Sequence, residues 1–121
     1  MPQKTKSALG APSAQIYTDE ATLLKKVVEW FEPQRRDGVK LLKIRDRYAK
    51  GYSDIFLNVR GQFVVAELKD DVGEPTPHQL DFIAEMVECG AIGGVCRSVA
   101  EVAALVEEAK RRRPDWTSTK R

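Results

Sequence analysis

The stretch GYSDIFLNVRGQFVVAELK, residues 51–69, decides the fold of this chain. Two segments rich in β-branched and aromatic residues, 53–59 and 62–69, flank the dipeptide Arg60-Gly61. This pattern predicts a β-hairpin in which the glycine supplies a positive φ at the turn. The second segment is apolar on both faces, which is typical of a central, buried strand.

Three charged residues, Asp54, Glu67 and Lys69, stand inside this predicted hairpin, where burial of a charge is costly. Because side chains alternate across a strand, Glu67 and Lys69 share one face of the central strand. Pairing around the turn places Asp54 opposite about Glu67 to Lys69, so the three side chains can meet. Buried carboxylates repel each other unless a cation lies between them. We therefore expect Asp54, Glu67 and a main-chain carbonyl near Leu68 to hold Mg²⁺ or Mn²⁺, which prefer oxygen ligands.

Lys69, beside such an ion, can orient or deprotonate an attacking water and stabilise charge on a phosphorane-like transition state. An isolated Glu-x-Lys pattern is more typical of a salt bridge at a sheet edge, here Glu67–Lys69 or Asp54–Lys69. The chemical interpretation depends on the combination of an acid on one strand, Glu-x-Lys on the next, and a further acid on the preceding helix.

That further acid is Glu20, at the start of a predicted amphipathic helix. At about 100° per residue, Glu20 lies about 40° from Leu24 and about 20° from Val27 and Phe31, near the centre of the apolar stripe. We therefore expect Glu20 to face the sheet. The alternative is that Glu20 only complements the positive N-terminus of the helix. Asp19, roughly 100° from the stripe, could do that without entering the core.

The other segments complete an α-β-β-β-α-β-α order, an α/β class with a mixed central sheet of about four strands flanked by helices. They are a helix from Thr18 or Asp19 to about Phe31, a loop at 34–38 after Pro33, a strand at 40–46 with Leu42 and Ile44 inward, a helix from Thr76 to Gly90, a strand at 91–96, and a last helix with Ser98 and Glu101 as capping box. The expected buried stripes are Leu24, Val27 and Phe31, then Leu80, Ile83, Met86 and Val87, and then Val99, Val102, Ala103, Val106 and Ala109.

Composition limits the class of protein. The chain has 121 residues, 42% of them hydrophobic and 31% charged, with a net charge of +2, which suits one folded domain. We expect a flexible N-terminal segment at 1–15, a domain at 16–110 and a basic C-terminal tail at 111–121. An acidic body with basic ends suits a protein that gathers carboxylates at one site and holds a polyanion, although the tail alone could be a solvated surface.

The sequence carries no apolar run long enough to span a bilayer and no apolar signal segment, so we expect a cytoplasmic protein. Its two cysteines, Cys89 and Cys96, lack the spacing of a zinc site, and we expect both to be reduced and packed. A lone histidine, His78, cannot build a zinc site, which again favours oxygen ligands and Mg²⁺ or Mn²⁺.

These motifs resemble the core of the PD-(D/E)XK nuclease superfamily. The sequence has G-Y-S-D, then A-E-L-K thirteen residues after Asp54, then G-E-P-T-P-H-Q, C-G-A and S-V-A-E. This ordered set is similar to the VRR-NUC branch in its stand-alone, virus-type form, and the similarity covers roughly residues 18–109. The residue before Asp54 is Ser53 where the family has proline, a departure in backbone shape that removes no catalytic group.

The resemblance implies a restriction-endonuclease-like fold and metal-dependent cleavage of DNA phosphodiesters, often at four-way (Holliday) junctions, by a homodimer. It also implies a virus-encoded protein that acts in the host cell. Carried onto this sequence, it makes Asp54 and Glu67 the metal ligands, Lys69 the catalytic lysine, Glu20 an acid that reaches the metal through water, and Gln79 the motif glutamine of the following helix.

Gln79 has a competing interpretation, because Thr76-Pro77-His78-Gln79 is also a complete capping box. His78 is expected at the surface of the helix start, where it could touch phosphate. Further nucleic-acid contacts are expected from basic residues, each of which could instead be a solvated charge: Lys43, Arg45, Lys50 and Arg60. If Lys43 and Arg45 share the face of Asp54, they approach the scissile backbone. Such phosphate contacts give salt-dependent affinity with little sequence preference.

Two alternatives to a junction resolvase stay open. One is another nuclease of the same family, acting on flaps or forks or nicking phage DNA. The other is a non-catalytic nucleic-acid-binding protein that keeps the fold, since fold alone does not decide function. Against the second, a protein that only binds DNA has no reason to keep clustered acids facing a polyanion.

Overall fold

The structure is a computed structural model that describes residues 10–43 and 55–119. Its elements are α2 (Glu20–Phe31), η1 (Glu32–Asp37), β1 (Val39–Lys43), β2 (Ile55–Val59), β3 (Gln62–Leu68), α3 (Pro77–Glu88), β4 (Ile92–Cys96) and α4 (Val99–Arg111). The four strands form one sheet in the order β1-β2-β3-β4. The first three run antiparallel to their neighbours, and β4 runs parallel to β3. The predicted α/β class and element order are confirmed.

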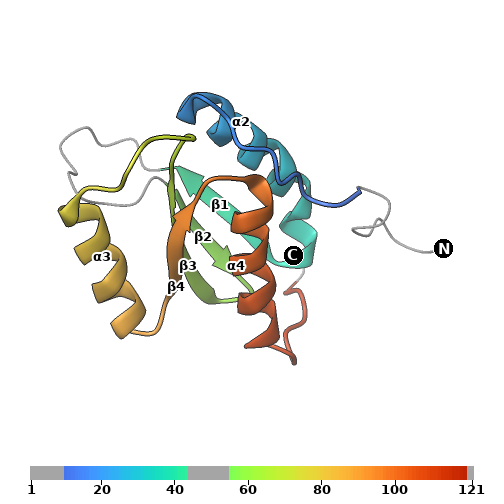
Figure 1. Cartoon of the computed structure of the whole chain (residues 1–121). Helices are drawn as coiled ribbons and strands as arrows, with labels where there is room; N and C mark the ends of the chain where they lie inside the picture. Colours follow the sequence, from blue (N-terminus) through green and yellow to red (C-terminus); the bar gives the residue numbers. More distant parts are fainter. Residues whose placement is uncertain (1–9, 44–54, 120–121) are drawn as a thin grey trace.

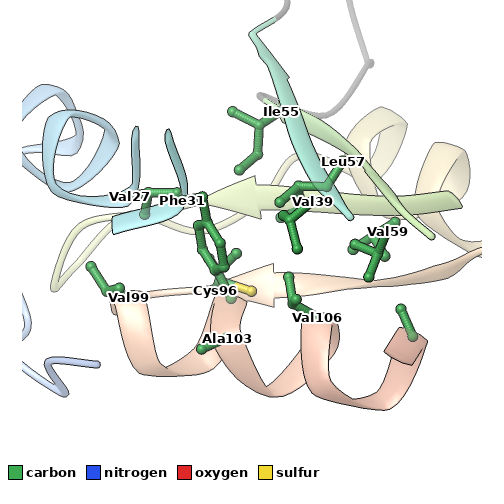
Figure 2. Close-up of a cluster of buried hydrophobic side chains, with 14 of the residues drawn as sticks. Val27, Phe31, Val39, Ile55, Leu57, Val59, Cys96, Val99, Ala103 and Val106 are labelled. Carbon is green, nitrogen blue, oxygen red and sulfur yellow. The ribbon is translucent and has the colours of Figure 1, made fainter. Parts of the chain in front are cut away.

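The sheet separates two helical layers (Figure 1). Helices α2 and α4 pack on one face, and α3 packs on the other, against β3 and β4. The main core lies between the sheet and the α2–α4 layer, where Figure 2 shows Phe31, Cys96, Ala103 and Val106 close together. All five residues predicted for the stripe of α4 are buried. Burial, reinforced by the charge of Glu101, raises the pKa of the Cys96 thiol to about 12.

The β2–β3 hairpin forms as predicted. Arg60 and Gly61 have φ of 56° and 87°, so two successive residues adopt the left-handed conformation of a tight hairpin turn. The Gly61 N–H donates to Asn58 Oδ1 at 2.8 Å, which satisfies the turn locally. The register then places Ile55 opposite Ala66. Strand β3 lies between β2 and β4 and is buried from Val64 onward, as expected of a central strand.

A charged cluster closes the hairpin end of the sheet, and we call Asp37, Arg60, Lys110 and Trp116 the Asp37 cluster. Arg60 donates to Asp37 Oδ1 at 2.7 Å, and Lys110 Nζ lies 2.6 Å from Asp37 Oδ2. The Arg60 guanidinium also lies 5.0 Å from the centre of the Trp116 ring. Partial burial alone would raise the pKa of Asp37, but Lys110 and Arg60 outweigh it and hold the pKa below its ordinary value of 3.8. The cluster therefore joins the hairpin to η1 and to the segment after α4.

Three predictions about the first half of the chain need correction. Segment 34–38 is not a loop, because the chain continues from α2 into the 3-10 helix η1, which Gly38 ends at φ 89°. Pro33 fits the start of η1, because the N–H groups of the first helical residues have no acceptor within the helix and proline lacks an N–H. In β1 the covered face starts at Val39, so Leu42 is 58% exposed instead of inward. In α2 Leu23 is buried together with Val27 and Phe31, and Leu24 is only half-buried.

The stripe predicted for α3 is also partly wrong. Ile83 is buried, but Leu80 and Val87 are 47% and 46% exposed. The ring of Phe82 stacks on Phe56 with centroids 6.1 Å apart, which turns the packed face of the helix toward Phe82, Ile83 and Met86. Helix α3 therefore presents apolar side chains away from the sheet.

Two smaller predictions differ at the ends of α3 and α4. Cys89 is exposed and only Cys96 is packed, although both are free thiols as expected. At the start of α4, Ser98 Oγ accepts from Glu101 N–H at 3.2 Å. The carboxylate of Glu101 then accepts from Arg97 N–H at 2.6 Å instead of from Ser98, so the predicted capping box is only half formed.

The ends of the described chain pack on the domain. The carbonyl of Ser13 accepts a hydrogen bond from Ala100 N–H at 2.8 Å, and that of Tyr17 accepts from Asp71 N–H at 2.9 Å. Trp116 belongs to the Asp37 cluster. The domain limits at 16 and 110 stay predictions. None of the helices in the described part of the chain is both long and apolar enough to cross a membrane.

Candidate functional site

Two carboxylates meet the side chain of Lys69 just beyond the end of β3. Lys69 Nζ lies 3.3 Å from Glu67 Oε2 and 3.8 Å from Glu20 Oε2. The Glu67 side chain has no exposed surface, that of Lys69 is 11% exposed, and that of Glu20 is 42% exposed. We call these three residues the Lys69 cluster. It is a buried charged centre with one wall open to solvent at Glu20.

The sheet positions two members of the cluster. Glu67 lies opposite Val95 in the parallel pairing of β3 with β4. The Lys69 N–H donates to the carbonyl of Cys96 at 3.0 Å, which extends this pairing past the last strand residue. Because side chains alternate along the strand, Glu67 and Lys69 project to the same face. The predicted shared face is thus explained by backbone hydrogen bonds that continue through both residues.

Helix α2 supplies the third member. Asp19 is the N-cap, and its carboxylate accepts from Ala21 N–H at 2.9 Å and Thr22 N–H at 3.2 Å. Its hydrogen bond from the Thr22 hydroxyl, followed by that from the Thr22 N–H, lowers the pKa of Asp19. Asp19 therefore performs the capping role that was the alternative for Glu20. The contact of Glu20 with Lys69 agrees with the prediction that this acid faces the sheet.

Asp54, the other predicted ligand, lies outside the described residues. Ile55, which follows it in sequence, is the first residue of β2 and lies opposite Ala66, next to Glu67 in β3. Strand β2 therefore begins at the same end of the sheet as the Lys69 cluster. Figure 1 shows the start of α2 and the end of β3 together at the top of the molecule.

Two acids of the Lys69 cluster have the donor atoms that a divalent cation would need. Glu67 and Glu20 offer carboxylate oxygens, the donors that Mg²⁺ and Mn²⁺ prefer, and no cysteine or histidine joins them in the Lys69 cluster. The donor chemistry therefore fits a hard divalent cation. Residues 10–43 and 55–119 alone bring together no group of three or more histidine, cysteine or acidic residues that could hold a metal. The metal-binding roles of Asp54 and of the Leu68 carbonyl stay predictions.

The loop after Lys69 is held by a residue that sequence reasoning missed. Arg97 donates to the carbonyl of Asp70 at 2.5 Å and lies 3.4 Å from Glu74 Oε2. Asp70 Oδ1 in turn accepts from the N–H groups of Val72 and Gly73. Arg97 directly follows β4. The signal in the sequence that could have indicated its role was an arginine at the end of a strand parallel to β3. It anchors the chain that leaves the Lys69 cluster.

Gln79 forms the predicted capping box in full. Its N–H donates to Thr76 Oγ1 at 3.1 Å, and its Oε1 accepts from Thr76 N–H at 2.8 Å. This geometry accounts for Gln79 as a helix cap, and a catalytic role stays a prediction. His78 is exposed in the first turn of α3, as expected.

The predicted nucleic-acid contacts divide into three groups. Arg45 and Lys50 lie outside the described residues. Arg60 belongs to the Asp37 cluster, at the opposite end of β3 from Lys69, and its contact with nucleic acid stays a prediction. Lys43 lies opposite Ile55 and on the α2 side of the sheet, whereas Glu67 lies on the α3 side, and its contact with nucleic acid stays a prediction.

The arrangement of helices and strands resembles that of a solved structure. A solved chain described as a VRR_NUC domain superposes on this chain with a TM-score of 0.58 and 29% sequence identity. The match covers 73% of this chain and 94% of the solved one. The chain therefore resembles a VRR-NUC domain in fold and in sequence. No protein-family model and no curated protein matches the sequence.

This structural match supports a nuclease-type domain with a restriction-endonuclease-like fold. In this chain the Glu-x-Lys pattern is Glu67-Leu68-Lys69, at the end of the central strand. The Lys69 cluster is therefore the candidate active site.

Proposed function

We propose that the protein is a metal-dependent endonuclease that hydrolyses phosphodiester bonds in DNA. The observation that carries the proposal is the contact of Lys69 Nζ with two carboxylates from separate elements, Glu67 at 3.3 Å and Glu20 at 3.8 Å, in a domain that resembles VRR-NUC. Burial of a carboxylate such as that of Glu67 lowers the stability of the fold compared with an apolar residue at the same place. Buried ionisable groups are therefore typical of functional sites.

In this proposal Glu67, Asp54 and the Leu68 carbonyl hold Mg²⁺ or Mn²⁺, with Glu20 reaching it through water. When bound, the ion supplies Lewis acidity toward a phosphoryl oxygen. Lys69 Nζ donates hydrogen bonds to the attacking water and to the non-bridging oxygens, where negative charge develops. Glu67 and Glu20 hold the ammonium group in position for both tasks, since each lies within 4 Å of it.

We further propose that the substrate is branched DNA, such as a four-way junction, cut by a homodimer with one active site for each strand. Support for self-association comes from the outer side of α3, where Leu80 and Val87 are nearly half exposed. Phe63 on β3 adds a side chain that is 37% exposed. Leu80→Glu is expected to lower the mass measured by light scattering from that of a dimer to that of a monomer.

Cleavage assays with Lys69→Ala test the proposed activity. The wild-type protein should nick branched DNA with Mn²⁺ or Mg²⁺ and not with EDTA, and Lys69→Ala should cut at least about 100-fold more slowly. Binding of the same DNA should persist, because Lys69 is only 11% exposed and adds little to surface charge. Lys110→Ala is the matched control, since Lys110 is similarly buried, at 13%, but pairs with Asp37 in the other cluster. Binding without cleavage of branched, linear or single-stranded DNA under either metal would favour a non-catalytic binding protein.

A further inference from the structure

An open groove runs between α2 and the edge strand β1. Its volume is about 430 Å³, and it is lined by Ala21, Leu24, Lys25, Val28, Glu29 and Lys43. Leu24 and Val28 are half-buried and form an apolar floor, while Lys25 and Lys43 come from opposite walls. The volume falls within the roughly 300–1,000 Å³ typical of ligand sites.

The two lysines of the groove differ from most other lysines in the described chain. Within residues 10–43 and 55–119, Lys25 and Lys43 form no ion pair. By contrast, Lys26, Lys69 and Lys110 each lie within 4.0 Å of a carboxylate. Glu29, the acidic residue of the groove, is the partner of Lys26. Lys25 and Lys43 therefore keep donors that no carboxylate in this part of the chain binds, and the charge of Glu29 is shared with Lys26.

The groove begins next to the candidate active site. Ala21, which lines it, directly follows Glu20, whose carboxylate contacts Lys69. With a rise of about 1.5 Å per residue, Lys25 lies about 7–8 Å along α2 from Glu20. A chain that passes the Lys69 cluster and enters the groove would thus meet Lys25 within about one nucleotide step.

We propose that this α2–β1 groove binds a single-stranded segment of DNA that continues from the cleaved phosphodiester. The inference rests on the proposed nuclease function and adds where one strand of the substrate leaves the site. Lys25 and Lys43 contact backbone phosphates, and the floor of Leu24 and Val28 covers bases or sugars. A single strand exposes its apolar base faces, whereas a duplex hides them in the stack, so an apolar floor between two lysines favours a single strand.

Binding of two DNA probes tests the groove independently of cleavage. Fluorescence anisotropy in EDTA would compare a blunt duplex with the same duplex carrying a single-stranded tail. Lys25→Gln with Lys43→Gln should weaken binding of the tailed probe by at least about 10-fold and that of the blunt probe by less than about 2-fold, and should reduce the salt slope by about 0.7 per lysine. Lys26→Gln with Lys40→Gln is the matched control, one substitution on each of the same two elements. It should change neither affinity by more than about 2-fold.

Three outcomes would overturn the proposal. The first is that the groove variant binds both probes equally more weakly, and the second is that the two double variants have equal effects. The third is that the groove variant loses self-association while its binding of the tailed probe is unchanged. That result would make the groove a contact between two copies of the chain. Thermal melts establish that the variants fold, and Lys25→Gln alone, on the exposed side of α2, serves if the double variant does not. If Lys69→Ala abolishes cleavage while substitution of Lys25 and Lys43 leaves the affinity for the tailed probe unchanged, the groove proposal fails and the nuclease proposal stands. If no DNA is cleaved but tail selectivity follows Lys25 and Lys43, the nuclease proposal fails and the groove is a single-strand binding site without a cleavage site beside it.

Discussion

The two ends of β3 carry charged clusters of opposite design. At the hairpin end, one carboxylate, Asp37, lies between two cations, and about half of its side chain is exposed. One of these cations, Arg60, also lies against the Trp116 ring. At the other end, one ammonium, Lys69, lies between two carboxylates, and Glu67 is fully buried. The first arrangement costs little desolvation and ties three segments together. The second buries charge deeply, and nothing in the sheet requires it, because β3 is already paired on both sides.

This difference separates residues that hold the fold from residues that act on a substrate. Surface pairs such as those of Asp37 contribute up to about 1 kcal/mol each and can be replaced at modest cost. A buried acid beside a lysine favours chemistry, because it is expensive to keep and specific in geometry. Substitutions at the hairpin end should therefore change stability, and substitutions at the Lys69 end should change cleavage.

Removal of the buried carboxylate gives the largest expected effect. Glu67→Gln should slow DNA cleavage by at least about 100-fold, because substitution of groups that only support metal ligands already costs about 10- to 100-fold. Glu20→Gln should have a smaller effect, about 10-fold, since Glu20 is 42% exposed and expected to act through water. Initial nicking rates with Mn²⁺ measure both. Asp37→Asn is the control at the other end and should leave the rate within about 2-fold, and a larger loss there would break the division between the ends.

A bulky residue at Gly38 tests the structural end. Gly38 has φ 89°, and a Cβ there would lie 2.6 Å from Arg60 Cγ and 2.9 Å from Trp116 Cζ2. Gly38→Val should lower the free energy of unfolding by about 2–3 kcal/mol, measured by urea denaturation. Gly90→Val is the matched control, because Gly90 has φ 109° but nothing within 4 Å of its would-be Cβ. If both variants lose the same stability, backbone strain alone explains the loss and the packing of Trp116 does not contribute.

Acid titration tests the charges of the Asp37 cluster. The folded pKa of Asp37 is lowered from 3.8, so its contribution to stability is present above that value and is lost as pH falls through the lower folded pKa. Wild type should exceed Asp37→Asn by about 1 kcal/mol or less near pH 6, because the side chain is half exposed. The difference should shrink below about pH 4. Urea denaturation of both proteins from pH 3 to 7 measures it, and a difference that grows on acidification would refute the assigned ion pairs.

Substitution of Gln79 gives the smallest expected effect, and it distinguishes between the two competing roles of this side chain. Gln79→Glu keeps an acceptor for the Thr76 N–H and should leave stability within about 0.5 kcal/mol, while Gln79→Ala should lose about 0.5–1 kcal/mol. If the cap is its only role, cleavage by Gln79→Glu equals that of wild type. A loss of cleavage with unchanged thermal stability would assign Gln79 to the active site as well.

Local patterns predicted much of the fold. The hairpin, the central position of β3, the cap of α3 and the buried stripe of α4 follow from turn chemistry, capping residues and periodicity within short segments. Prediction failed where a contact with a distant part of the chain decides which face of a helix is buried. Phe82 stacks on Phe56 and turns α3 away from Leu80, and no local signal shows that pairing.

The candidate site shows the same limit. The spacing of Glu67 and Lys69 along one strand predicted their shared face, and the stripe of α2 predicted that Glu20 turns toward the sheet. The role of Arg60 was missed because its partner Asp37 lies on a different element, 23 residues earlier. In β1 Leu42 was expected to point inward, whereas the covered face begins at Val39, which the expected strand omitted.

The contact between Lys69 and Glu20 has a consequence for the order of folding. Glu67 and Lys69 come into place with a local hairpin, which forms quickly, but Glu20 arrives only when the first helix docks across a long loop of chain. Refolding monitored by strand formation should therefore run ahead of recovered catalysis, and enzymatic turnover would report the last step by which this chain becomes native.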